Sequence, residues 1–469
     1  MNHVHLIAIC GTGMSALAGM FKEKGFKVTG SDQNVYPPIS DILKEQGIEI
    51  RVGYKPENLA DKPGLVIVGN AVSRNNPEVE ALLQSKIPYL SMPQALKEFF
   101  LKGKKKIVIA GTHGKTTTSS IAAWILEACG KDPGFLIGGI PKNFERNYKL
   151  GKGEFFVIEG DEYDTAFFDK GPKFLHYEAD VAILTSVEFD HADIFKDFSQ
   201  VEDAFRKFIQ KIPRESKLIL CGEDKNLMKL SCETTCQTET YGISKEDKRS
   251  YDWSLEKESK GNGETIFKII HKGNILGEGV TSLLGDHNLA NLLGTVAALS
   301  GLGLSIDEIK TGIKTFLGVK RRQEVVGEEK GITVVNDFAH HPTAVRETIR
   351  AFKESYPERR IWAVFEPRSN TSRRNIFEKK YAEAFLEADK IIIAGVYNQN
   401  LLDDEIRFSP QRVIDTLRNN DKEAFYIEKV DDIITHLVTN LKTGDIVLIM
   451  SNGGFGGIHG KLLEALKDK

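Results

Sequence analysis

Short apolar runs alternate along the chain with amphipathic stretches of helical length. The strand-length runs include 4–10, 107–110, 155–158 and 181–187, and the amphipathic stretches include 14–24, 116–129 and 201–212. A repeated order of strand and then helix is typical of βαβ units built around parallel sheets. The pattern therefore predicts an α/β protein.

Breaks in this rhythm divide the chain. A lysine-rich run at 102–106 precedes a new strand, and the rhythm restarts at 332–336 after a further change of composition. A chain of 469 residues is too long for a single hydrophobic core. The polar, turn-rich segment 231–279 predicts a hairpin insertion in the middle part. We expect three domains, at 1–102, 103–317 and 318–469.

Charge and composition exclude several classes of protein. A formal net charge of -3 argues against a protein built mainly to bind nucleic acid or an anionic membrane. The N-terminus lacks a basic n-region, and no apolar run reaches the roughly 18 residues that span a bilayer. Five scattered cysteines do not form a disulfide framework, and ordinary thiols are favoured over metal binding at Cys232 and Cys236. We expect a cytoplasmic protein.

The strongest chemical motif is the segment Gly-Thr-His-Gly-Lys-Thr-Thr-Thr at 111–118, between a predicted strand and helix. Its glycines allow a sharp turn that directs backbone N–H groups at an anion. Lys115 would pair with phosphate oxygens, and the Thr116 hydroxyl would ligate Mg²⁺. The upstream glycine of the longer phosphate loop is absent, and a glycine turn with a chance lysine is the alternative. We expect ATP to contact Gly111, Thr112, His113, Gly114, Lys115, Thr116 and Thr117.

Two acidic clusters follow predicted strands. Glu-Gly-Asp-Glu-Tyr-Asp occupies 159–164, and Glu-Phe-Asp-His-Ala-Asp occupies 188–193. In a parallel sheet both clusters would lie at the carboxyl edge, together with the phosphate loop. Oxygen ligands there suit Mg²⁺, and a histidine can join the set. Taken singly, each cluster is also typical of a helix N-cap or a solvated loop.

A second glycine turn, Gly11-Thr12-Gly13-Met14-Ser15, follows the first predicted strand, with Asp32 about twenty residues on. This pattern indicates a helix N-terminus that holds a pyrophosphate, which nucleotide sugars and nicotinamide cofactors both contain. A hydride-transfer enzyme would leave the phosphate loop at 111–118 without a role.

The order of these motifs resembles the Mur ligase family over essentially the whole chain. The resemblance includes both glycine turns, both acidic clusters, Gly-Asp-His-Asn at 285–288 with Asn291, and the pair Arg321-Arg322. It implies a Rossmann-like N-terminal domain that binds UDP, a central P-loop ATPase-like domain and a Rossmann-like C-terminal domain. It also implies an ATP-dependent ligase of class EC 6.3.2 that works through an acyl phosphate and releases ADP and phosphate.

Segments 189–195, 337–343, 365–370 and 451–457 resemble one branch of that family. That branch joins UDP-N-acetylmuramate to the tripeptide L-alanyl-γ-D-glutamyl-meso-diaminopimelate in peptidoglycan recycling. The alternative is the branch that adds L-alanine during peptidoglycan synthesis. A nucleotide-binding switch, which splits ATP without joining anything, is the rival from another class. The chain is expected to be a monomer or a dimer.

The resemblance also implies roles for individual residues. The catalytic residues would be Lys115, His191 and Glu162, with Thr116, Glu162 and His191 at Mg²⁺. ATP would also meet Asn288, Arg322 and Asp337. The UDP part would contact Gly11, Thr12, Gly13, Met14, Ser15, Asp32, Asn70 and Ser73.

Three side chains keep more than one interpretation. His341 and Arg368 would contact the peptide, although Arg368 could be a surface arginine. The pair His340-His341 invites a zinc site, but a loop cap or a peptide contact is favoured. His113 would face the lactyl carboxylate of the substrate or merely shape the turn.

Overall fold

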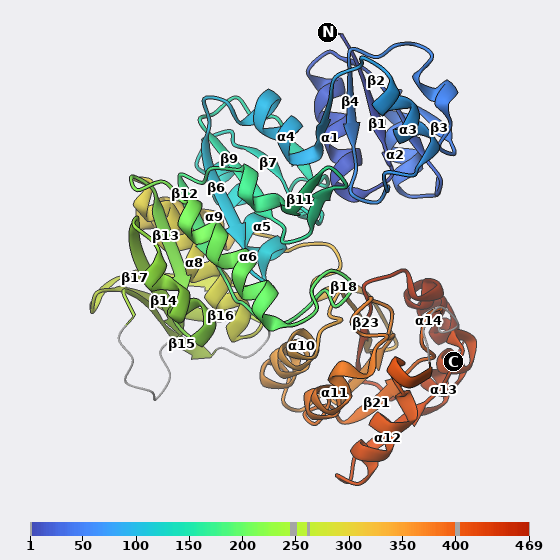
Figure 1. Ribbon diagram of the computed structural model, residues 1–469. Coiled ribbons are helices and arrows are strands. Elements are labelled where there is room, and N and C mark those ends of the chain that lie inside the picture. The colour runs from blue at the N-terminus through green and yellow to red at the C-terminus, as the bar shows by residue number, and fades with distance from the viewer. Residues whose placement is uncertain (1, 244–250, 260–262, 399–403, 469) are drawn as a thin grey trace.

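The computed structural model describes residues 2–243, 251–259, 263–398 and 404–468. Three large sheets, each flanked by helices, follow one another along the chain (Figure 1). The first lies in the blue part of the ribbon, the second runs from the cyan part to the yellow part, and the third lies in the orange and red part. The predicted α/β class and three-domain architecture are confirmed. In the described ranges, no helix has both the length and the apolarity needed to cross a membrane.

The N-terminal sheet has five parallel strands in the order β3-β2-β1-β4-β5. The strands are β1 (His3–Ile7), β2 (Lys27–Asp32), β3 (Glu49–Val52), β4 (Leu65–Val68) and β5 (Tyr89–Ser91), and the helices are α1 (Thr12–Glu23), α2 (Ile39–Glu45), α3 (Pro77–Gln84) and α4 (Met92–Leu96). Strand β1 is shorter than the predicted run 4–10, because Ala8 turns the chain with a φ of 65°. The strand order reverses between β1 and β4, and this reversal opens a crevice at the carboxyl ends.

The central sheet has ten strands in the order β17-β16-β15-β14-β13-β12-β6-β9-β7-β8. Its strands are β6 (Lys105–Ala110), β7 (Gly134–Leu136), β8 (Tyr148–Lys149), β9 (Phe155–Gly160), β12 (Val181–Leu184), β13 (Lys217–Cys221), β14 (Gln237–Ile243), β15 (Trp253–Ser259), β16 (Thr265–His271) and β17 (Asn274–Thr281). Its helices are α5 (Lys115–Ala128), α6 (Phe198–Lys211), α7 (Lys225–Leu230), α8 (Asp286–Gly301) and α9 (Ile306–Lys314), and a separate small hairpin joins β10 (Asp164–Ala166) to β11 (Asp169–Pro172). Strand β6 lies between β12 and β9 and is parallel to both. The segments after these three strands therefore meet at one edge.

The predicted hairpin in the middle part is confirmed for the described residues. Strands β15, β16 and β17 pair in antiparallel fashion and extend the central sheet at its end. Residues 244–250 and 260–262 of the predicted segment lie outside the described residues.

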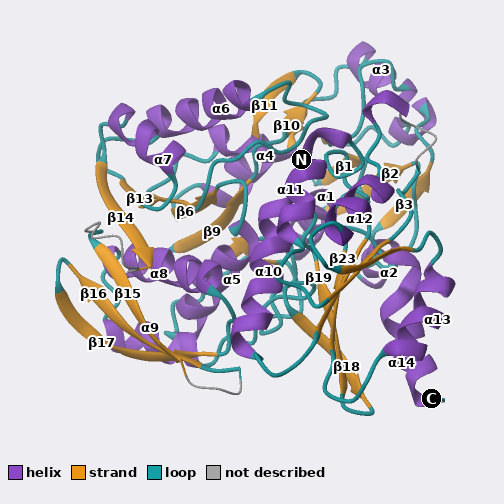
Figure 2. Ribbon diagram, turned by 90° about the horizontal axis from the view of Figure 1, so that it is seen from below, coloured by secondary structure: helices purple, strands orange, loops and turns teal. Residues whose placement is uncertain are grey.

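The C-terminal sheet has the order β18-β19-β23-β20-β21-β22, with only the edge strand β18 antiparallel to its neighbour. The strands are β18 (Glu324–Glu329), β19 (Ile332–Asp337), β20 (Ile361–Phe365), β21 (Lys390–Ile393), β22 (Glu423–Tyr426) and β23 (Ile446–Met450), and the helices are α10 (Pro342–Ser355), α11 (Glu378–Ala384), α12 (Pro410–Arg418), α13 (Val430–Asn440) and α14 (Ile458–Lys467). Figure 2 shows α13 and α14 on one side of β23 and α10 and α11 on the other. Strand β23 is buried on both faces, so it is apolar throughout.

Specific contacts join the domains. Gly19 on α1 packs so closely on β8 that a Cβ there would lie 2.3 Å from the Tyr148 hydroxyl. On the other side, the segment 188–193 touches the C-terminal domain: the Asn370 amide donates to Asp193 at 2.9 Å, and the backbone N–H of Ala192 donates to Thr371 at 3.2 Å. One acidic cluster is therefore part of a domain interface.

Candidate active site

The phosphate loop joins β6 to α5, as the sequence predicts. Gly114 has a left-handed φ of 79°, and a Cβ there would lie 2.5 Å from Asn291 Oδ1. A Cβ on Gly111 would lie 2.1 Å from Thr185 Oγ1. Both positions therefore require glycine. Thr112 fixes the loop to the segment after β12, because its hydroxyl accepts the backbone N–H of Glu188 at 2.9 Å.

Lys115 is directed at the acidic edge of the sheet. Its Nζ donates to both carboxylate oxygens of Glu162, at 2.8 and 3.0 Å, and to the Gly111 carbonyl at 2.5 Å. Burial opposes the charge of the ammonium, but the carboxylates of Glu162 and Asp161 outweigh it and raise the pKa of Lys115. A fixed cation thus lies at the mouth of the loop.

His191 belongs to the same cluster. Its Nε2 lies 3.0 Å from Glu162 Oε1, and its ring lies 4.3 Å from that of Tyr163. The residue has a left-handed φ of 57°, and its backbone N–H donates to Asp190 at 2.7 Å. Burial disfavours protonation, yet the hydrogen bond and charge of Glu162 raise the pKa of His191. The structure therefore brings together the three side chains expected to be catalytic.

Glu159, the first residue of the acidic cluster at 159–164, also faces the phosphate loop, although it was not among the individual residues that we expected at Mg²⁺. Its carboxylate accepts the Thr116 hydroxyl at 3.0 Å and the backbone N–H of Gly138 at 2.7 Å. Burial is the main cause of a raised pKa for Glu159. Of the residues expected at Mg²⁺, Glu162 and His191 are neighbours, whereas Thr116 contacts Glu159. The carboxylates, hydroxyl and imidazole at this edge match the donors that Mg²⁺ accepts.

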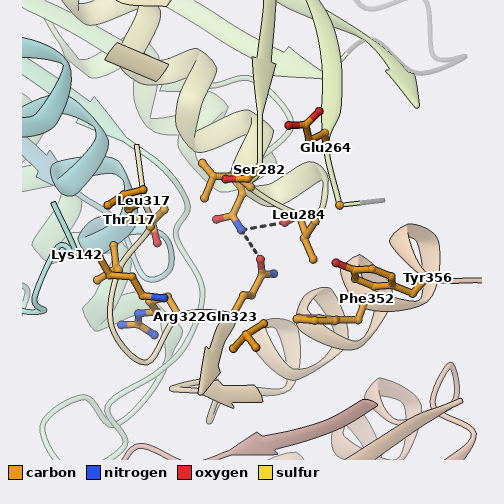
Figure 3. Close-up of a pocket in the computed structure, with 16 residues that line it drawn as sticks. Thr117, Lys142, Glu264, Ser282, Leu284, Leu317, Arg322, Gln323, Phe352 and Tyr356 are labelled. Carbon is orange, nitrogen blue, oxygen red and sulfur yellow. Dashed lines mark hydrogen bonds between the residues drawn. The ribbon is translucent and has the colours of Figure 1, made fainter. Parts of the chain in front are cut away.

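A cavity of about 310 Å³ lies beside the loop, between the central and C-terminal domains (Figure 3). Phe352 and Tyr356 form one side of it, and Lys142 and Arg322 lie on the other. An aromatic wall facing cations suits a base and its phosphates. The cavity thus combines the features that a nucleotide requires.

Asn288, which also lines the cavity, donates from its Nδ2 to the Leu284 carbonyl at 2.9 Å and to Gln323 Oε1 at 3.1 Å. Thr117, Asn288 and Arg322 were all expected at ATP, and all three line this space. The sequence motifs did not indicate Lys142, Gln323, Phe352 or Tyr356.

Asp337 shapes the entry to the C-terminal domain. Its carboxylate accepts the backbone N–H groups of Gln323 and Ala339, both at 2.7 Å. The guanidinium of Arg322 lies 4.6 Å from the centre of the Phe338 ring, and burial lowers the pKa of Arg322. Asp337 therefore orders the turn that carries Arg322. Contact of Asp337 with nucleotide remains a prediction.

The N-terminal glycine turn lies at the crevice between β1 and β4. Asp32 accepts the backbone N–H of Cys10 at 2.9 Å, which holds the turn, and Ser15 donates to the Thr12 carbonyl at 3.1 Å. The Met14 side chain is buried in the core, so only its backbone faces the turn. Gly11, Thr12, Asn70 and Ser73 are exposed, and Gly13 is half-buried.

The two residues expected at the peptide differ in their surroundings. The Arg368 guanidinium lies 3.7 Å from the centre of the Tyr397 ring and 3.6 Å from Glu366. His341 is only 3% exposed and forms the N-cap of α10, where its Nδ1 accepts the backbone N–H of Thr343 at 3.3 Å. His341 therefore caps a helix, whereas we expected the histidine pair to cap a loop, and contact of either side chain with a peptide remains a prediction.

Comparison with known proteins agrees with this architecture. The model of the Mur ligase family catalytic domain matches residues 3–103, that of the Mur ligase middle domain matches 109–299, and that of the Mur ligase glutamate ligase domain matches 321–453. Together these matches cover most of the chain.

Individual relatives match over the whole length. UDP-N-acetylmuramate--L-alanyl-gamma-D-glutamyl-meso-2,6-diaminoheptandioate ligase of Escherichia coli K12 is 41% identical, over 99% of this chain and 98% of the relative. UDP-N-acetylmuramate--L-alanine ligase of Carboxydothermus hydrogenoformans is 34% identical, over 99% of this chain and 96% of the relative. The crystal structure of a murein peptide ligase from Psychrobacter arcticus matches with 35% identity and a TM-score of 0.72, over 100% of this chain and 99% of that one.

Proposed function

The chain belongs to the Mur ligase family, and on that basis we propose that it joins UDP-N-acetylmuramate to the tripeptide L-alanyl-γ-D-glutamyl-meso-diaminopimelate, splitting ATP to ADP and phosphate. The observation that carries this proposal is the meeting of Lys115, Glu162 and His191 beside an interdomain cavity. ATP must activate one substrate before the second substrate is joined to it. Such a reaction needs a site for the phosphates of ATP and a domain that closes over that site.

The reaction brings two anions together, because the lactyl carboxylate must attack the γ-phosphate of ATP. Lys115 neutralises the phosphate oxygens, and the loop N–H groups around Gly111 and Gly114 bind them. Thr116 and Glu162 would hold one Mg²⁺ and His191 would help to hold a second, and these ions would supply further positive charge. Arg322 holds the nucleotide in the cavity, and closure of the C-terminal domain excludes water from the acyl phosphate.

The substrates occupy the two sides of this centre. The UDP part binds the turn at Gly11–Ser15 with Asp32 behind it, because that turn directs α1 at the crevice of the N-terminal sheet. The peptide enters from the C-terminal domain near Arg368, whose charge suits the carboxylates of the tripeptide. We infer that a protein using these substrates acts in the cytoplasm, in the recycling of peptidoglycan.

We favour the tripeptide over L-alanine as the acceptor. The E. coli relative named for the tripeptide is more similar to this chain than the relative named for L-alanine. The deciding experiment supplies UDP-N-acetylmuramate and ATP with either acceptor in parallel, and measures product and ADP. We expect ligation with the tripeptide and none in Lys115→Ala. Ligation of L-alanine alone would favour the other branch, and ADP release without any acceptor would favour a switch.

A further inference from the structure

A second group of possible metal ligands lies behind the phosphate loop. His113 belongs to the loop, Glu188 follows β12, and His341 caps α10 in the C-terminal domain. His113 Nε2 lies 3.2 Å from Glu188 Oε2, and His341 Nδ1 lies 3.6 Å from the same oxygen. The ligand atoms of all three side chains lie within 4.8 Å of one another. Three segments that are distant in sequence thus converge on one point.

These separations fit a tetrahedral ion. Zinc holds nitrogen and oxygen ligands at about 2.0–2.2 Å, so neighbouring ligand atoms of a tetrahedral site lie roughly 3.3–3.6 Å apart. The two measured separations from Glu188 Oε2, 3.2 and 3.6 Å, bracket this range. The ligand atoms of His113 and His341 lie within 4.8 Å of each other, so a tetrahedral ion requires these two side chains to approach.

The surroundings select the required tautomer of His341. Its Nε2 lies 3.2 Å from the Phe189 carbonyl, which can only accept, so Nε2 carries the hydrogen. The lone pair is therefore on Nδ1, the atom that faces Glu188. A backbone carbonyl that orients the far nitrogen is the usual support of a metal-bound histidine. An ion would replace the long 3.3 Å bond from the Thr343 amide and the 3.2 Å hydrogen bond between His113 Nε2 and Glu188, and His113 would have to carry its hydrogen on Nδ1.

Neighbouring groups support the same arrangement. The Thr343 hydroxyl donates to Glu188 Oε2 at 2.7 Å and orients the carboxylate. Burial and the nearby His113 lower the pKa of His341 to about 3, so the ring is neutral at physiological pH. His340 faces elsewhere, with Nδ1 3.0 Å from the Phe338 carbonyl, so the pair His340-His341 does not form the site.

We propose that His113, Glu188 and His341 form a binding site for a divalent transition metal of the zinc type, which ties the C-terminal domain to the phosphate loop. Two imidazoles and one carboxylate favour zinc, cobalt or nickel over Mg²⁺, which prefers oxygen ligands. Because the ligands come from two domains, the ion binds the closed arrangement and opposes reopening. Zinc therefore lowers turnover at Mg²⁺ concentrations that support the reaction.

Cobalt provides a direct readout, since tetrahedral Co²⁺ absorbs strongly in the visible range. The full-length protein is titrated with Co²⁺ in excess Mg²⁺, and Zn²⁺ is then added to displace the cobalt. We expect one equivalent of tetrahedral Co²⁺, with affinity lowered at least about 100-fold in His341→Gln and in Glu188→Gln. His340→Gln and His191→Gln serve as matched controls and should keep the spectrum.

Unchanged binding in both His341→Gln and Glu188→Gln would overturn the proposal, as would no tetrahedral spectrum in the wild type or its loss in His191→Gln. Thermal unfolding of each variant reports folding, and the half-exposed Glu188 provides the test if His341→Gln is unstable. The readout does not require ligation, so its failure is distinct from a failure of the proposed function.

Discussion

Lys115 and Glu162 form a buried ion pair. The lysine side chain is 12% exposed and the glutamate 2%, so each charge depends on the other for its solvation. The ion pair with Glu162 therefore both orients Lys115 and stabilises the fold. Substitutions can separate the role of Lys115 in activity from its role in stability.

Removing only the lysine should cost stability as well as activity. Lys115→Met leaves Glu162 buried with His191 as its remaining partner, and we expect a loss of roughly 3 kcal/mol in the free energy of unfolding. Adding Glu162→Gln should recover most of that loss but no ADP release. Urea unfolding and an ADP assay measure the two effects. A double variant as unstable as the single one would show that Lys115 stabilises the fold by another route.

Gly453 leaves room for Arg368. A Cβ at this position would lie 1.9 Å from Arg368 Nε, whereas a Cβ on Gly454 would have no neighbour within 4 Å. We expect Gly453→Ala to displace the guanidinium and raise the KM for the tripeptide about tenfold, the loss of one charged hydrogen bond. The KM for ATP should not change. Gly454→Ala is the matched control, and equal effects in both variants would remove Arg368 from the peptide site.

His341, the N-cap of helix α10, is neutral in the folded protein. The pKa of His341 is lowered from 6.5 to about 3, chiefly by burial. The unfolded chain therefore takes up a proton near pH 6.5, whereas the folded chain does so only near pH 3. Stability should fall as the pH drops through that window, by an amount on the order of 2–4 kcal/mol, and level off below it.

His341→Asn tests this dependence, because asparagine can cap the helix but does not titrate. Its stability between pH 6 and pH 3 should fall less than that of the wild type. The pH dependence that the variant keeps includes the contribution of Glu188. The pKa of Glu188 is lowered to about 2 against the effect of burial, mainly by the hydrogen bond and charge of His113. The free energy of unfolding of both proteins is measured by chemical denaturation at each pH. An equal fall with pH in the two proteins would show that His341 is not the group responsible.

The elements that carry the glycine turns and the two acidic clusters were predictable, since each of these motifs follows a strongly apolar strand. The sequence did not indicate that β9 continues through Gly160, which makes Glu159 a strand residue directed at α5. It also did not indicate Phe352 and Tyr356, which occupy ordinary positions along α10 and after it. Their place in the cavity depends on how two domains pack, and local periodicity carries no information about that packing.

The N-terminal and central domains also pack closely against each other, at Gly19 and Tyr148. Gly19→Ala would bring a Cβ within 2.3 Å of the Tyr148 hydroxyl, so either the Tyr148 ring or α1 must shift. We expect a several-fold increase in the KM for UDP-N-acetylmuramate with little change for ATP. Tyr148→Leu removes the obstructing ring and should restore the KM in the double variant. A failure to rescue would mean that the domains do not meet through this pair.

The segment 188–193 contacts both the central domain and the C-terminal domain. Its His191 contacts Glu162, the Phe189 carbonyl is 3.2 Å from His341, and Asp193 accepts from Asn370 of the C-terminal domain. Opening the molecule must therefore pull on the segment that positions His191. These six residues therefore couple the position of the C-terminal domain to the position of His191, and we expect little ATP hydrolysis when that domain is displaced.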